Sequence, residues 1–224
     1  MDTYSTKQEK TVINGSPYFI KTLKDRTQFS DPNGAAESLG ISSAMWPISG
    51  MLWPSGIVLA EVVSKLSLTN LRVLEVGCGI GLASLVAASK GANITASDYH
   101  PLTPTLLRDN SALNDLPSIR YFKGDWRKPI TGMGVFDLII GSDLLYVSEN
   151  PEILATFINC HLAKNGEVIM IDPCRKQANK FIKKMSTLYL DCTEQKQLQS
   201  DKPEKLQQFN CYTFKRLHVA EYKN

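Results

Sequence analysis

The chain has 224 residues, of which 43% are hydrophobic and 21% charged, values typical of a globular protein that buries a core. Its formal net charge of +3 is too small to make nucleic acid or a membrane surface the expected partner. The polar N-terminus lacks the apolar core of a signal peptide, and no apolar run approaches the roughly 20 residues that cross a bilayer.

The N-terminal part of the chain predicts an arm that precedes the main α/β pattern. A hairpin is expected over Thr11–Leu23, where Asn14-Gly15 separates two apolar runs. Pro17 is expected to make this hairpin irregular, because proline cannot donate to a strand ladder. Residues 29–56 are rich in Gly, Ser, Pro and Asp and contain two tryptophans. We expect an ordered, irregular lead-in, because large aromatic side chains require burial.

From the lead-in onward, predicted helices and strands alternate. The strands are apolar on both faces, which indicates a mostly parallel sheet covered by helices on both sides. The expected strands are Val73–Val76, Asn93–Ser97, Arg120–Lys123, Phe136–Gly141 and Glu167–Ile171. The expected helices are Gly56–Leu66, Leu82–Ser89, Thr105–Leu113, Pro151–Leu162 and a lysine-rich one after the fifth strand.

The C-terminal part changes character. Two extended runs, Leu188–Gln199 and Phe209–Leu217, flank a polar turn at Asp201–Glu204 and predict an antiparallel pair at one edge of the sheet. We therefore expect a single domain over residues 1–224, with an arm and lead-in at 1–52 and an α/β core at 53–224.

The first strand of the core ends in a glycine-rich turn, Gly77-Cys-Gly-Ile-Gly81, before a helix. Such a turn suits an anionic or polar ligand, because glycine permits close backbone approach and the helix N-terminus offers free N–H groups. A triphosphate site would need a Gly-Lys-Ser/Thr end, which is absent. A dinucleotide site would need its third glycine at position 82, which is Leu82. A tight connection that binds no ligand remains an alternative.

Polar side chains end the next two strands as well. Asp98 follows the second strand, where its carboxylate can accept both ribose hydroxyl protons, or can cap the following helix. Asp125 and Trp126 follow the third strand and could bind an adenine, although Trp126 alone could be ordinary core filling. Suitable groups at three strand ends together favour a nucleoside-containing ligand.

These pieces, together with Asp137-Leu-Ile-Ile-Gly-Ser-Asp-Leu-Leu-Tyr146, carry a family resemblance over about Trp46 to Arg175. The span resembles the class I S-adenosylmethionine-dependent methyltransferases, and within them the methyltransferase-16 group, which includes many protein lysine methyltransferases. Glu75, two residues before the first glycine, completes the Glu-x-Gly-x-Gly-x-Gly pattern. The resemblance implies a doubly wound, mostly parallel seven-stranded Rossmann-like sheet with an antiparallel final strand.

The resemblance also implies S-adenosylmethionine as the cofactor and a role for each matching residue. The methionine part would lie against Glu75, Gly77, Cys78 and Gly79. The ribose would bind Asp98, and the adenine would bind Asp125 and Trp126. Ser142 and Trp53 would contact the cofactor from the fourth strand and the lead-in.

For the methyl acceptor, Asp143-x-x-Tyr146 resembles the Asp-x-x-Tyr motif of the same group. Asp143 and Tyr146 would be the catalytic residues that hold an amine, although Asp143 could cap a turn and Tyr146 could be a half-buried structural tyrosine. Asp172-Pro-Cys-Arg175 resembles the Asp-Pro-Gly-Arg of one lysine methyltransferase branch, with a cysteine in place of the glycine. Arg175 could bind an acidic group of the substrate or cofactor, but we expect it to be a solvated surface residue, the commoner outcome for arginine.

The expected activity is methyl transfer to a lysine of a protein. A small amine or N-heterocycle as acceptor is the alternative, and an inactive cofactor-binding interaction domain is a third reading, disfavoured by the intact polar groups. Five scattered cysteines without a Cys-x-x-Cys pair predict reduced thiols, and no metal site is expected. We expect a cytoplasmic monomer that binds neither nucleic acid nor membrane.

Overall fold

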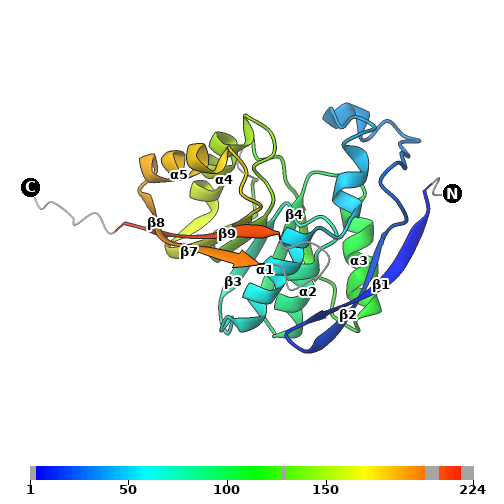
Figure 1. The fold of residues 1–224 in the computed structure, drawn as a ribbon, viewed down its shortest axis with the longest axis horizontal. Coiled ribbons are helices and arrows are strands. Elements are labelled where there is room, and N and C mark those ends of the chain that lie inside the picture. The colour runs from blue at the N-terminus through cyan, green and yellow to red at the C-terminus, as the bar shows by residue number, and fades with distance from the viewer. Residues whose placement is uncertain (1–3, 128–129, 200–206, 218–224) are drawn as a thin grey trace, which may run out of the picture.

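A seven-stranded sheet forms the centre of the protein (Figure 1). The computed structural model describes residues 4–127, 130–199 and 207–217. The strand order is β5-β4-β3-β6-β7-β9-β8, in which β3 to β7 are parallel and β9 runs antiparallel to both of its neighbours. The bounds are β3 Arg72–Val76, β4 Asn93–Asp98, β5 Arg120–Lys123, β6 Phe136–Ser142, β7 Leu162–Asp172, β8 Leu190–Gln199 and β9 Gln208–Arg216.

Two layers of helices cover the sheet, as the unbroken apolar strands predict. One core cluster joins α1 (Pro54–Lys65), α2 (Leu82–Ser89) and α3 (Thr103–Leu113) to one face. A second cluster joins α4 (Asn150–His161) and α5 (Ala178–Thr187) to the opposite face. Successive β3 residues, Val73 and Leu74, belong to different clusters because side chains alternate across a strand. The doubly wound fold and the antiparallel edge pair are confirmed, whereas the turn at 201–204 lies outside the described residues.

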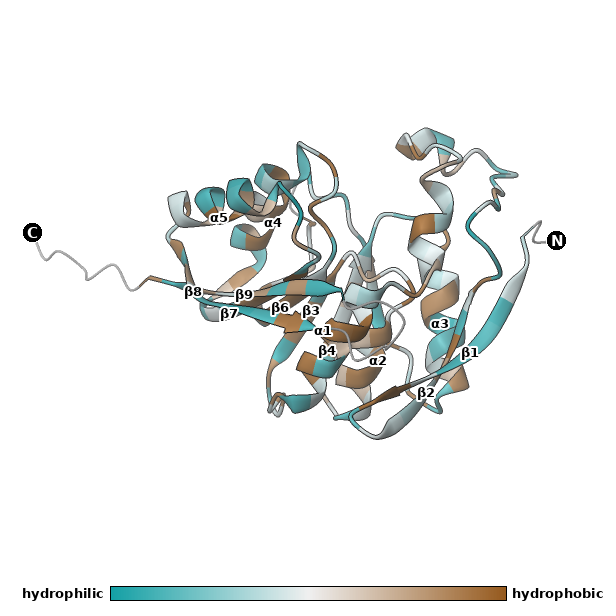
Figure 2. Cartoon of the chain, in the orientation of Figure 1, coloured by the Kyte–Doolittle hydropathy of each residue, from teal (hydrophilic) through white to brown (hydrophobic). Residues whose placement is uncertain are grey.

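Hydrophobic residues concentrate on α1, α2 and the inner strands, whereas the edge strand β8 and the hairpin strand β1 are largely hydrophilic (Figure 2). Polar residues on an edge strand discourage pairing with another chain. At the centre of the sheet, β3 lies between β4 and β6, so the chain runs outward from β3 and then returns to its other side. Open α/β sheets bind ligands outside the carboxyl ends of the strands at such a reversal.

The predicted hairpin consists of β1 (Thr6–Ile13) and β2 (Ser16–Leu23), joined by Asn14 and Gly15 with φ of 47° and 79°. Positive φ at both central residues is typical of a type I′ turn. The expected irregularity at Pro17 was wrong, because the register is continuous from one end to the other. Pro17 faces Val12 in a pair that exchanges no backbone hydrogen bonds, so its missing N–H points away from β1.

The outer edge of β2 packs against α3 through two asparagine side chains. The Oδ1 atoms of Asn110 and Asn114 accept the backbone N–H groups of Lys21 (2.7 Å) and Phe19 (2.9 Å). Their Nδ2 groups donate to the carbonyls of the same two residues. Asn110 also donates to the carbonyl of Ile80, inside the glycine turn. Asn110 therefore ties the hairpin to the loop that forms the candidate site.

Asn110→Ala is expected to lower the free energy of unfolding by roughly 2–3 kcal/mol, because it leaves buried backbone groups without partners. Asn110 has no exposed surface, whereas Asn114 is half-buried. Asn114→Ala is the matched control and should cost less than about 1 kcal/mol, since water can replace its contacts. Urea unfolding of both variants measures the difference, and equal losses would contradict the role given to Asn110.

The lead-in contains two short 3-10 helices, η1 (Glu37–Leu39) and η2 (Trp46–Gly50), and buries Trp46 at 2% exposure. Trp46–Lys65 is a 20-residue stretch with the length and composition of a membrane span, which the sequence reading did not anticipate. It consists of η2 and α1, and Met51 between them is extended. The twelve residues of α1 reach about 18 Å, short of the roughly 30 Å of a bilayer core.

Candidate active site

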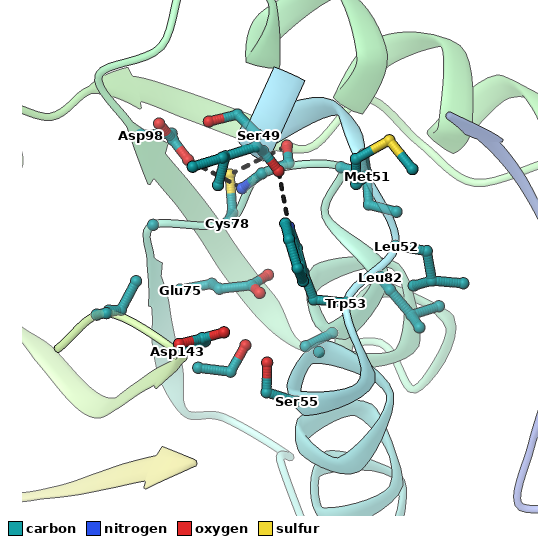
Figure 3. Close-up of a pocket in the computed structure, with 18 of the residues that line it drawn as sticks. Ser49, Met51, Leu52, Trp53, Ser55, Glu75, Cys78, Leu82, Asp98 and Asp143 are labelled. Atoms are coloured by element: carbon teal, nitrogen blue, oxygen red, sulfur yellow. Dashed lines mark hydrogen bonds between the residues drawn. The ribbon is translucent and has the colours of Figure 1, made fainter. Parts of the chain in front are cut away.

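A cavity of about 300 Å³ opens at the carboxyl ends of β3, β4 and β6, and the end of the lead-in covers it (Figure 3). All but one of the predicted site residues line it, namely Trp53, Glu75, Gly77, Cys78, Gly79, Asp98, Trp126, Ser142, Asp143 and Tyr146. Residues that the sequence did not single out for the site also line it, including Ile48, Ser49, Met51, Leu52, Ser55 and Tyr99. Residues 48–53, at the end of the lead-in, therefore form one wall of the cavity.

The glycine turn shapes the floor of the cavity. Gly77 has a φ of +62°, and a Cβ atom there would lie 2.4 Å from Cδ2 of Leu144. Gly79 has a φ of +51°, and a Cβ atom there would lie 3.2 Å from the carbonyl oxygen of Ser49. Only glycine combines this backbone conformation with so little space. Between them, burial raises the pKa of the Cys78 thiol, which favours its neutral form.

Asp98 supports the glycine turn as well as lining the cavity. Its side chain accepts the N–H groups of Gly79 and His100, each at 2.9 Å, and the residue is 5% exposed. Burial raises its pKa, and these hydrogen bonds oppose that shift. A carboxylate oxygen can accept more than one hydrogen bond, so Asp98 retains the capacity to receive ligand hydroxyl groups.

Glu75 is a carboxyl group with only one oxygen engaged. The N–H and the hydroxyl of Ser84 both donate to Oε2, whereas Oε1 has no hydrogen-bond partner within the described residues. Burial raises the pKa of Glu75 to about 7. Near neutral pH the site therefore contains a carboxyl group that a cationic ligand would readily ionise.

The pKa of Glu75 in the folded protein exceeds its ordinary value of 4.5, so protonation of this carboxyl group favours the folded state. This stabilisation is complete below pH 4.5 and is lost as the pH rises through about 7. The expected loss is about 3 kcal/mol, at roughly 1.4 kcal/mol per pKa unit. Urea unfolding from pH 4.5 to 8 should show this decline in the wild type and a shallower one in Glu75→Gln. Substitution of the exposed Glu37 by Gln is the control, and parallel curves for all three proteins would contradict the assignment.

Asp125 is the predicted residue that does not line the cavity. Its Oδ1 atom accepts a hydrogen bond from the Nε–H of Arg127 at 2.8 Å, so the carboxylate forms an ion pair with this arginine. Trp126 does line the cavity, and its indole N–H is buried without a partner among the described residues. The adenine contact predicted for these two residues thus has a free donor at Trp126.

Asp143 stands at the end of β6 in a left-handed conformation, with a φ of 55°. Its N–H donates to the carbonyl of Ile171 at 2.8 Å, which fixes the turn. Its Oδ1 atom accepts the Nε–H of Arg175 at 2.5 Å. The side chain therefore forms an ion pair in the cavity wall, and it caps no helix in the described part of the chain.

Arg175 is the functional candidate that the sequence reading underrated. It lines the cavity, pairs with Asp143, and its guanidinium lies 5.9 Å from the centre of the Tyr146 ring. Tyr146 shares a side-chain hydrogen bond with Tyr99, and burial raises the pKa of both phenols. The sequence feature that could have identified Arg175 is the Asp-Pro-Cys-Arg motif after β7. Because β7 pairs with β6 in the sheet, residues that follow β7 lie near Asp143 at the end of β6.

Trp53 fixes the conformation of the lead-in where it lines the cavity. Its indole N–H donates to the carbonyl of Ile48 at 2.7 Å, and the guanidinium of Arg26 lies 4.7 Å from its ring centre. In Figure 3 the Trp53 ring faces the space between Glu75 and the lead-in. The glycine cradle, the unpartnered indole of Trp126 and the open oxygen of Glu75 fit a ligand that combines apolar, hydrogen-bonding and cationic parts.

Comparison with known proteins identifies the family. Residues 38–188 match the family model described as lysine methyltransferase. The protein N-lysine methyltransferase METTL21A of Xenopus tropicalis is 30% identical over 130 residues, which cover 55% of this chain and 60% of that protein. The histone-arginine methyltransferase METTL23 of Mus musculus is 31% identical over 52% of this chain and 49% of its own. The histidine protein methyltransferase 1 homolog of Dictyostelium discoideum is 31% identical over 52% of this chain and 40% of its own.

Solved structures show the same fold. TYW2 of M. jannaschii, in complex with AdoMet, has a TM-score of 0.60 at 14% identity, over 95% of this chain and 88% of its own. The magnesium protoporphyrin IX methyltransferase of Synechocystis, with bound SAM, has a TM-score of 0.59 at 14% identity, over 87% and 89%. The matched region spans about 60% of the METTL21A sequences. The chain therefore belongs to the lysine methyltransferase family, a family of S-adenosylmethionine-dependent enzymes.

Proposed function

We propose that the protein is an S-adenosylmethionine-dependent methyltransferase that modifies a lysine side chain of another protein. One observation carries the proposal: a single cavity is lined both by the residues expected to bind the cofactor at the ends of β3 and β4 and by Asp143 and Tyr146, which follow β6. Relatives that match this chain are named as methyltransferases of protein lysine, arginine and histidine. Family membership and the Asp-x-x-Tyr motif favour lysine among these three acceptors.

In this proposal, residues at the ends of different strands bind different parts of the cofactor. Glu75 and the glycine turn would hold the methionine part, Asp98 the ribose, and Trp126 with Asp125 the adenine. When bound, S-adenosylmethionine supplies a methyl group on a positively charged sulfur, which a neutral nitrogen attacks in line. The work left to the protein is to exclude water, to align the amine and to keep it uncharged.

Asp143, Tyr146 and Arg175 would act on the acceptor. The carboxylate of Asp143 attracts an incoming ammonium group, and the neutral phenol of Tyr146 can accept or donate a hydrogen bond to the amine. Arg175 lies beside Asp143, so its positive charge opposes that of a bound ammonium. A nearby like charge lowers the pKa of an amine and therefore favours the neutral nucleophile.

The surroundings of the cavity also bear on the acceptor. Three arginines lie in or next to residues of the site: Arg26 contacts Trp53, Arg127 follows Trp126, and Arg175 lies in the cavity wall. Two of the three are paired with aspartates. Because the partner aspartates offset two of the three positive charges, the surroundings of the cavity do not by themselves favour an acceptor with acidic neighbours.

The test uses the purified protein, methyl-labelled S-adenosylmethionine and a cell extract separated into macromolecular and small-molecule fractions. We expect label in a discrete protein band, and mass spectrometry of that band should identify methyl-lysine. Label at arginine or histidine would keep protein methylation and reject lysine. Label confined to the small-molecule fraction would reject a protein acceptor and favour a small amine.

A further inference from the structure

Ser55 is a buried polar residue at the cavity that the motifs of the sequence do not account for. It occupies the first turn of α1, is 2% exposed, and lines the cavity. Its hydroxyl oxygen is buried and has no hydrogen-bond partner among the described residues. An unpaired buried hydroxyl costs free energy, which a ligand that supplies the missing hydrogen bond would recover.

The groups around Ser55 define the ligand chemistry. Glu75 presents its free Oε1 atom to the cavity, and Asp143 uses only Oδ1 in its bond to Arg175. A Cβ atom at Gly56 would lie 3.9 Å from the hydroxyl of Ser142, so the start of α1 abuts the end of β6. In Figure 3 the hydroxyl of Ser55 points toward the space that Glu75 and Asp143 also face.

This end of the cavity therefore offers oxygen atoms and carboxyl groups. An ammonium group satisfies such a set, because it carries three N–H donors and a positive charge. A ligand carboxylate would be repelled by Glu75 and Asp143, and a sulfonium has no N–H to offer the hydroxyl. The deeper position of Glu75 and Ser55 (4% and 2% exposed) separates them from Arg175, whose side chain is 38% exposed at the acceptor end.

We propose that the hydroxyl of Ser55, together with Oε1 of Glu75, binds the α-ammonium group of the methionine part of the cofactor. This assignment rests on the cofactor named in the proposed function. It makes Ser55 a cofactor-binding residue contributed by α1, whereas the other predicted contacts to the methionine part come from β3 and its glycine turn. The start of α1 then contacts the cofactor directly, beside Trp53.

The test is a calorimetric comparison of three probes that differ in this group. S-Adenosylhomocysteine has the ammonium and the carboxylate, decarboxylated S-adenosylmethionine has only the ammonium, and methylthioadenosine has neither. Ser55→Ala should weaken binding of the first two probes about tenfold, the effect of a hydrogen bond to a charged group. It should leave methylthioadenosine unchanged, and Ser55→Thr, which keeps the hydroxyl, should retain most of the affinity.

Ser64→Ala is the control, because its hydroxyl lies in the same helix and donates to the carbonyl of Glu61. Unchanged affinity of Ser55→Ala for S-adenosylhomocysteine would overturn the proposal. An equal loss for all three probes would show an effect of cavity shape and would also overturn it. A loss that disappears with the decarboxylated probe would assign the hydroxyl to the carboxylate instead. Failure of the wild type to bind S-adenosylhomocysteine would instead reject the cofactor.

Discussion

Asp98→Asn is expected to weaken binding of S-adenosylhomocysteine by roughly 100-fold. The substitution removes the negative charge and one acceptor oxygen that would receive the ribose hydroxyl protons, and two hydrogen bonds to a charged group account for a loss of this size. Calorimetric titration with S-adenosylhomocysteine measures the change.

Asp98 also accepts the N–H groups of Gly79 and His100, so its substitution affects the turn itself. Thermal unfolding of the ligand-free variant is therefore measured alongside, and binding is titrated well below the midpoint. Asp98→Glu is a second variant, which keeps the charge and moves it by one methylene group. Wild-type affinity in Asp98→Asn would show that the ribose is not held by this carboxylate.

Asp143→Ala should have the second large effect, this time on turnover. We expect methyl transfer to fall on the order of 100-fold or more, the usual size of effect for a group that positions or exchanges protons with a reacting atom. Affinity for S-adenosylhomocysteine should change less than about twofold, because Asp143 makes none of the proposed cofactor contacts. Transfer of label into the protein fraction measures the first quantity, and calorimetry the second.

Asp137→Asn provides a matched control at the other end of the same strand. Asp137 accepts two hydrogen bonds from the Arg72 side chain and one from its backbone, far from the cavity. The Arg72 side chain holds the pKa of Asp137 at about 2. The control should therefore lower stability slightly and leave turnover intact. Wild-type turnover in Asp143→Ala would show that Asp143 has no role in methyl transfer to the acceptor.

The fold was predictable because its signals are local. The apolar runs of β3 and β6, the spacing of Gly77 and Gly79, and the Asn14-Gly15 turn each fix a short piece of backbone through residues next to one another. Asp98 and Asp143 were predictable for the related reason that carboxyl ends of parallel strands meet at one edge of the sheet. The structure places both side chains in the lining of one cavity.

Contacts between distant segments could not be predicted in this way. The sequence gives no means of knowing that Pro17 turns its nitrogen away from β1, that Asp125 pairs with Arg127, or that Arg175 reaches Asp143. Each depends on how a side chain is oriented once the sheet has brought its neighbours together. Residues 48–52 and Ser55 likewise were identified as part of the site only from the way the lead-in and α1 pack beside the end of β6. The sequence alone determined the succession of strands and helices and the polar residues that follow β3, β4 and β6. Tertiary packing decided which of the polar groups remain without a partner and are open to a ligand.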